Sequence, residues 1–184
     1  MNVVEKIKNH FGRIYLHAEI KKQNKQNKLI SFDSINEIGI VYNADNTSEE
    51  IIAHNFASHL RNEGKKVLLL GFVNQNKLPH NKKIHISSEF FCREKLNWFN
   101  LPEKNKIGRF LEIRFDLLLN LYHDNLLPLQ AISVYSKAQY KMGGNIKDAL
   151  KYFDFIIDTG NTKDINNLAN QMEHYLKSAS CINS

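Results

Sequence analysis

Short runs of apolar, often β-branched residues alternate with segments of helical spacing along this chain, and this alternation restricts the fold more than any other feature. The runs cover 38–42, 66–73, 84–87, 115–121 and 153–158. Nearly continuous apolar strands separated by helices are typical of a mostly parallel sheet covered on both faces. The sequence therefore predicts a three-layer α/β fold, Rossmann-like or flavodoxin-like, with about five mostly parallel strands and an N-terminal amphipathic helix.

Turn and capping residues predict where the intervening helices begin and end. Thr47 and Glu50 have the spacing of a capping box, and Gly64 is suited to end the helix that follows. Pro128 suits the first turn of a second helix, which we expect to continue through Met142 until two glycines stop it. A last helix is predicted from Thr162 to about residue 178.

One connection departs from the strand–helix–strand pattern. The link between the second and third strands, 74–83, is too short for an ordinary crossover helix. The strand predicted at 84–87 is therefore either an antiparallel edge strand or is reached by a loop.

The first 28 residues differ in charge from the rest of the chain. The protein has 184 residues and a formal charge of +6, from 25 Lys and Arg against 19 Asp and Glu. Residues 1–28 hold seven of the basic and two of the acidic residues, so this segment carries +5 and residues 29–184 carry +1. We predict a basic amphipathic helical arm at 1–28, followed by a single α/β domain at 29–184.

Apolar residues of this arm recur three and four positions apart, as on one face of a helix. They are Val4, Ile7, Phe11, Ile14 and Ala18. Such a stripe can pack on the parent domain, mediate self-association or enter the groove of a protein partner. Together with a basic face, it can also lie on an anionic membrane surface.

The basic side chains of the arm are the candidates for contact with an anionic partner. They are Lys6, Lys8, Arg13, Lys21, Lys22, Lys25 and Lys28. We expect RNA or a ribonucleoprotein ahead of a membrane surface, because clustered cations bind phosphates. The alternative is an ordinary solvated face, since Gln and Asn interleave the lysines.

Polar residues follow the predicted strands, where open parallel sheets bind their ligands. They are Asn43, Asp45, Asn120, Asp158, Thr159 and Lys163. This set predicts a ligand crevice for a nucleotide or sugar phosphate at the carboxyl edge of the sheet. The alternative is that these side chains only cap turns and the helices that follow, which Asn and Asp commonly do.

Several well-defined chemistries lack their motifs. The chain has neither GxGxxG nor GxxxxGK[ST], and Asp45, Glu49 and Glu50 occupy the first strand–helix turn, where they would repel a phosphate. It also lacks HExxH and GxSxG, so no metal ligand or catalytic residue is predicted and no cofactor is identified. These gaps favour a non-enzymatic binding or adaptor protein, with a small enzyme or ligand sensor as the alternative.

The apolar runs and the cysteines indicate the cellular compartment in which we expect the protein. The longest apolar run, 67–73, is far short of the roughly 20 residues that cross a bilayer. No signal-peptide core precedes the first strand. Cys92 and Cys181 lie far apart, outside any CxxC pattern, and indicate reduced thiols in a cytoplasmic protein.

Three segments, 115–120, 136–143 and 153–158, resemble a family of uncharacterised small bacterial α/β proteins, a likeness that covers most of 38–158. That resemblance implies a Rossmann-like fold and no particular activity. Residues 116–121, followed by Ser136, Ala138, Lys141 and Gly143, are similar to a strand–helix unit in the N-terminal lobe of heptosyltransferase-type glycosyltransferases. Those enzymes need two such lobes and this chain has room for one, so the likeness implies scaffold alone.

Overall fold

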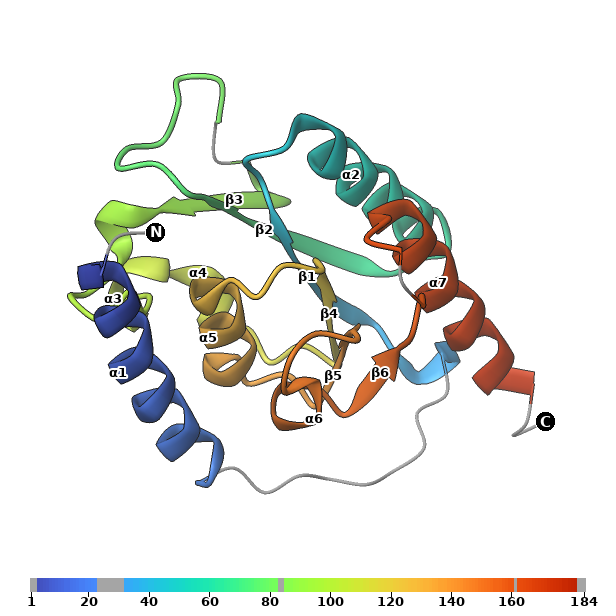
Figure 1. Ribbon diagram of the computed structural model, residues 1–184. Coiled ribbons are helices and arrows are strands. Elements are labelled where there is room, and N and C mark those ends of the chain that lie inside the picture. The colour runs from blue at the N-terminus through green and yellow to red at the C-terminus, as the bar shows by residue number, and fades with distance from the viewer. Residues whose placement is uncertain (1–2, 23–31, 83–84, 161, 182–184) are drawn as a thin grey trace.

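The computed structural model (Figure 1) describes residues 3–22, 32–82, 85–160 and 162–181. Its centre is a six-stranded sheet with the order β3-β2-β1-β4-β5-β6, in which every neighbouring pair is parallel. The strands are β1 (Glu37–Asn43), β2 (Lys66–Val73), β3 (Ser88–Cys92), β4 (Leu117–Leu121), β5 (Tyr140–Gly144) and β6 (Phe155–Ile157). The order changes direction between β1 and β4, as in a doubly wound Rossmann-like sheet. The predicted fold class is confirmed, with one strand more than expected.

Two long helices, α2 (Thr47–Asn62) and α7 (Ile165–Cys181), pack side by side on one face of the sheet (Figure 1). Their apolar residues form one core cluster with the strand side chains that point to this face, and the cluster includes Ile40, Phe56 and Leu168. Alternate side chains of the same strands point to the opposite face, so both faces of the sheet bury apolar surface.

In the described part of the chain, five α-helices cover the opposite face. They are α1 (Val3–Ile20), α3 (Lys104–Ile107), α4 (Arg109–Glu112), α5 (Leu127–Tyr135) and α6 (Ala149–Tyr152). Helix α5 lies against the sheet, and α1 packs on α5 (Figure 1). As a result, residues 127–134 of α5 are all buried.

The sixth strand comes from a segment where the sequence predicted helix. Helix α5 ends at Tyr135, Ser136 turns to extended backbone, and its hydroxyl accepts a hydrogen bond from the Ala138 amide at 3.1 Å. Residues Tyr140–Gly144 then pair with β4. The helical spacing through Met142 was misleading, because a strand buried on both faces is apolar at positions that also fit a helix.

Gly143 allows β5 to lie close to the side chain of Phe153. A Cβ atom there would lie 2.3 Å from the Phe153 ring, so the strand and this ring approach each other only because the side chain is absent. A mid-strand glycine of this kind marks a close approach rather than a helix stop.

Two further local predictions need correction. The third strand is β3, Ser88–Cys92, later than the predicted 84–87; it is parallel to β2 and is reached by a loop. The N-cap of α2 is Asn46, whose side chain accepts from the Ser48 amide at 3.0 Å, so the expected capping box of Thr47 and Glu50 is not formed. Asparagine is as good an N-cap as threonine, and its position one residue earlier decides the helix start.

Candidate functional site

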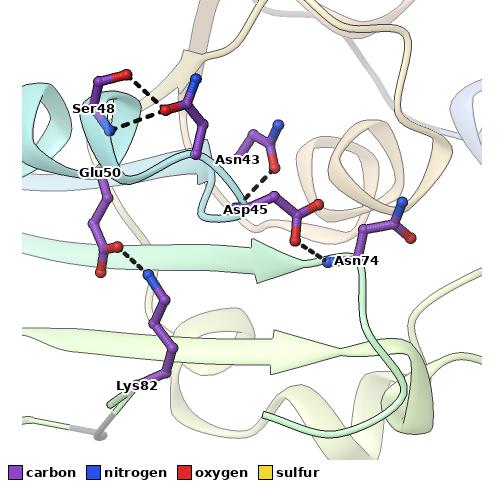
Figure 2. A network of polar contacts seen from close by, with 7 residues as sticks. Asn43, Asp45, Ser48, Glu50, Asn74 and Lys82 are labelled. Atoms are coloured by element: carbon purple, nitrogen blue, oxygen red, sulfur yellow. Dashed lines mark hydrogen bonds and ion pairs between the residues drawn. The ribbon is translucent and has the colours of Figure 1, made fainter. Parts of the chain in front are cut away.

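The predicted crevice residues at the end of β1 are engaged in holding neighbouring turns (Figure 2). The Asn43 side-chain oxygen accepts from the Asp45 amide at 3.2 Å, and an Asp45 carboxylate oxygen accepts from the Asn74 amide at 2.8 Å. Asp45 therefore ties the end of β1 to the end of β2.

Asn120 lies within β4 and is completely buried. Its amide nitrogen donates to the Met142 carbonyl of β5 at 3.0 Å, and its oxygen accepts from the Ser133 hydroxyl of α5. The side chain therefore links β4, β5 and α5 inside the core.

The remaining predicted crevice residues lie in the loop after β6. Asp158 accepts from the Gly160 amide at 2.9 Å, and the Thr159 hydroxyl donates to the Thr162 carbonyl at 3.1 Å. Lys163 is 3.7 Å from the Asp124 carboxylate, which follows β4. These contacts bring the loop to the edge of β4, but they belong to a turn and a solvent-exposed ion pair.

Beside the first turn of α2 lies a second polar group (Figure 2). Lys82, from the loop before β3, forms an ion pair with Glu50 of α2, and the Lys82 side chain is only 9% exposed. Its ammonium also lies 5.4 Å from the centre of the Phe90 ring. Burial and the nearby Glu50 carboxylate raise the pKa of the Tyr42 phenol, so this tyrosine stays neutral at ordinary pH. The group fastens the loop to α2.

A pocket of about 380 Å³ opens at the carboxyl edge of the sheet, on the α5 side. Side chains from five parts of the chain line it: α1, the end of β2, η2 (Arg93–Lys95), the loop around Asn100 and the start of α5. The lining residues are Glu5, Asn9, Phe72, Asn74, Arg93, Leu96, Asn100, Asn125, Leu126, Leu127 and Pro128. None of the six predicted crevice residues is among them.

Arg93 is held at this pocket by the turn that Asp45 stabilises. The Asn74 side-chain oxygen accepts from Arg93 Nε at 2.8 Å, and the Asn74 amide donates to Asp45 at 2.8 Å. Within the described residues, the two terminal guanidinium nitrogens make no hydrogen bond or ion pair.

The α1 side of the pocket is fixed by Asn100, which has a left-handed backbone (φ 59°) that asparagine tolerates better than most residues. Its amide donates to Glu5 at 2.9 Å and to Asn9 at 2.8 Å. Further along α1, Arg13 donates to the Gln130 side chain at 3.0 Å and to the Asn125 side chain at 3.2 Å. At Gly12, the residue before Arg13, an added Cβ would lie 2.5 Å from the Phe99 carbonyl oxygen, so α1 approaches this loop at close range.

The apolar stripe of α1 faces away from the domain. Val4, Ile7, Phe11 and Ile14 are 45–53% exposed, and Ala18 is exposed as well. The buried positions, Gly12 and Leu16, lie on the opposite side of the helix at 100° per residue. Tyr15, Trp98 and Phe99 are also exposed, at 49%, 59% and 39%.

The predicted anion-contacting cations have different surroundings. Lys6 and Lys21 are exposed, Lys8 lies 5.4 Å from the centre of the Trp98 ring, and Lys22 pairs with Glu19 at 2.7 Å. Arg13 is used in the contacts with Asn125 and Gln130. Lys25 and Lys28 lie outside the described residues.

Metal and thiol chemistry find little support. Within the described ranges, no three His, Cys, Asp or Glu side chains are grouped so as to hold a metal ion. Cys92 is buried, and desolvation raises the pKa of its thiol, which disfavours the reactive thiolate. No helix in the described part of the chain is long and apolar enough to span a bilayer.

The predicted set of six crevice residues missed the lining of this pocket. Arg93 begins η2, and Asn100 and Asn125 lie in loops. The packing of α1 brings Glu5 beside them. The one available signal was position, since Arg93 and Asn125 follow apolar runs that end at the carboxyl edge of the sheet.

Comparison with known proteins gives a family but no activity. No curated protein and no solved structure matches the chain, so the likeness to heptosyltransferase-type glycosyltransferases finds no support. A family model does match, over residues 8–178, and it is described as a family of unknown function (DUF6913). The match covers nearly all of the α/β fold and most of α1, and the chain is therefore a member of the DUF6913 family.

Proposed function

We propose that this is a non-enzymatic binding protein that docks on a partner through the outward face of α1. The observation that carries the proposal is the orientation of this helix. Its large apolar side chains point to solvent while its polar side attaches to the domain. Contiguous exposed apolar surface of this kind is typical of interaction sites.

The charges around the stripe favour an anionic partner surface. Both carboxylates of α1 face the domain, where Glu5 accepts from Asn100 and Glu19 pairs with Lys22 and Lys104. Lys6 is exposed and Lys8 lies at the edge of the stripe. Two copies meeting through this face would bring their lysines together, so charge disfavours self-association.

The central apolar area favours a protein, including the protein part of a ribonucleoprotein, over bare RNA. Phosphates are bound by cations and hydrogen-bond donors, and they gain nothing from Ile7 or Phe11. A groove with an apolar floor and an acidic rim matches both parts of the surface, as in helix-in-groove recognition.

A site-specific photo-crosslinker tests the proposal in cells that produce the full chain. Placed at Phe11, it is expected to capture a protein, and the capture should be lost in the variant Lys6→Glu/Lys8→Glu. Ile51 of α2 is a matched control position, because it is 55% exposed and also lies on a helix. Equal capture from both positions would contradict the proposal.

RNA and membrane binding are the competing outcomes. Purified full-length protein is titrated with RNA and with vesicles containing anionic lipid, in low and high salt. Salt-sensitive binding to RNA that persists in the Ile7→Ser/Phe11→Ser variant would show that the partner is a nucleic acid and not a protein. Binding to vesicles that is lost in this variant would show that the partner is a lipid surface.

A further inference from the structure

We propose that the pocket between α1, η2 and α5 is a binding site for a small phosphorylated sugar, either free or as the ribose phosphate of a nucleotide. This site is independent of the proposed docking function, because it uses the inward side of α1. Its volume of about 380 Å³ lies in the range typical of small-molecule pockets.

The side of the pocket formed by β2, η2 and α5 offers hydrogen-bond donors. Arg93 is fixed through Nε by Asn74, and its two terminal nitrogens are left for a ligand. The Asn125 oxygen accepts from Arg13 and from Gln130 at 2.5 Å, so the Asn125 amide nitrogen is turned away from both. Arginine with an oriented amide donor is suited to the several oxygens of a phosphate.

The start of α5 adds to this donor side. No side chain among the described residues caps the helix, and Pro128 in its first turn has no N–H of its own. The Leu127 amide therefore remains as a donor at the positive end of the helix dipole, and Leu127 lines the pocket. An anion between this amide and Arg93 would be stabilised from two sides.

The α1 side of the pocket offers acceptors. One oxygen of Glu5 accepts from Asn100 at 2.9 Å, and the carboxylate lines the pocket. A carboxylate would repel a second phosphate but binds sugar hydroxyls well, because each hydroxyl can donate to it. The apolar side chains of Phe72 and Leu96 complete the lining, where the carbon skeleton of a sugar can pack. The distribution of donors and acceptors thus matches a molecule with one anionic group and several hydroxyls.

The test measures binding of ribose 5-phosphate, AMP, inorganic phosphate and ribose to the full chain by calorimetry. Ribose 5-phosphate or AMP is expected to bind more tightly than inorganic phosphate or ribose. If ribose 5-phosphate binds more tightly than AMP, the ligand is a free sugar phosphate; if AMP binds more tightly, it is a nucleotide. Arg93→Gln should weaken the binding about tenfold or more, since a charge-assisted hydrogen bond contributes roughly 1.5–3 kcal/mol.

Two further variants separate a site from a general charge effect. Arg114→Gln removes an exposed arginine elsewhere and should leave the affinity unchanged. Glu5→Gln should weaken ribose 5-phosphate more than inorganic phosphate, because only the sugar donates to Glu5. In the ¹H–¹⁵N spectrum, the Leu127 amide should shift on addition of ligand. The proposal is overturned if none of the four compounds binds at millimolar concentration, or if Arg93→Gln and Arg114→Gln bind alike.

Discussion

At the scale of single residues, polar side chains at the carboxyl edge divide into those that serve the fold and those left for a ligand. Asn120 belongs to the first kind. It is fully buried, and its two polar atoms are satisfied by Met142 of β5 and Ser133 of α5. Arg93 belongs to the second kind, because Nε is the one atom of its guanidinium that is hydrogen-bonded by the residues the structure describes. Sequence position alone does not separate them, since both residues lie in or directly after a buried strand.

We expect Asn120→Ala to lower the free energy of unfolding by about 1–3 kcal/mol, because it leaves the Met142 carbonyl and the Ser133 hydroxyl buried without this partner. Chemical denaturation measures the change. The double variant Asn120→Ala/Ser133→Ala provides the control. It should be less destabilised than the sum of the single variants, because removing both members of a pair is milder than removing one. Strictly additive effects would show that the two side chains do not interact.

At the scale of elements, the sequence predicted that α1 exists but not which side of it faces inward. The stripe at Val4, Ile7 and Phe11 was compatible with packing on the domain or with an outside partner. In the structure these side chains are exposed and Leu16 is buried. The inward side is chosen by contacts that no local pattern contains. Among these are the close approach at Gly12 and the hydrogen bonds of Arg13 to Asn125 and Gln130, which lie 112 and 117 positions later in the chain.

This orientation predicts that two substitutions on α1 change the free energy of unfolding by very different amounts. Leu16→Ala should lower the free energy of unfolding by about 2–5 kcal/mol, because Leu16 is completely buried. Phe11→Ser should change it by no more than about 0.5 kcal/mol, since the ring is half exposed. Thermal or chemical unfolding of the two purified variants makes the comparison. A large loss in Phe11→Ser would mean that the stripe is buried in the free protein.

The attachment of α1 should also depend on pH through His17. Its Nε2 is buried, and no hydrogen-bond partner is found for it in the described part of the chain. Burial, with a contribution from Lys151 of α6, lowers the pKa of His17 below its usual 6.5, so the folded protein binds this proton less readily than the unfolded chain does. The contribution of the neutral imidazole to stability is therefore complete above pH 6.5 and is lost as the pH falls below it.

The measurement is the thermal unfolding midpoint at pH 7.5 and pH 5.5. We expect the midpoint to fall at the lower pH in the natural protein and to fall less in His17→Gln, which cannot gain the charge. His10 is exposed on the same helix, so His10→Gln should retain the full pH dependence. Identical pH dependence in all three proteins would rule out His17 as its source.

Local pattern was sufficient for most strands but failed where two secondary structures share one pattern. β1 and β2 are as predicted to within a residue at each end, because their apolar runs are bounded by clear turn residues. Residues Tyr140–Gly144 were predicted as helix, since their apolar positions continue the spacing of α5. Pairing with β4 on one side and β6 on the other, which no local pattern contains, decides for the strand.

At the scale of the whole molecule, α1 is part of the layer that covers the sheet. Strands β1 and β4 cover the side of α5 that faces the sheet, and α1 covers its outer side. The charge boundary near residue 28 therefore does not mark where the packing of the α/β domain ends. The net charge of +5 on residues 1–28 belongs to a segment whose helix also completes the core.

Truncation tests this arrangement. Removing residues 1–28 should lower the unfolding midpoint and promote aggregation, because it uncovers the apolar outer side of α5. Unfolding and light scattering of the shortened chain measure both effects. The full-length Phe11→Ser protein is the matched control, since it loses stripe surface but keeps the cover. A shortened chain that is monomeric and equally stable would establish 29–184 as an independent unit.

The contact between Arg13 and Gln130 joins residues 117 positions apart, and this separation has a consequence for the timing of synthesis. At about 5–20 residues per second, a ribosome needs roughly 6–23 seconds to make the interval between them. Throughout that time α1 has been made but the helix on which it packs has not. Once α1 has left the ribosome, both its outward stripe and the inner side that later closes the pocket are open to the surroundings. A partner that recognises α1 can thus reach the nascent chain before the domain is complete.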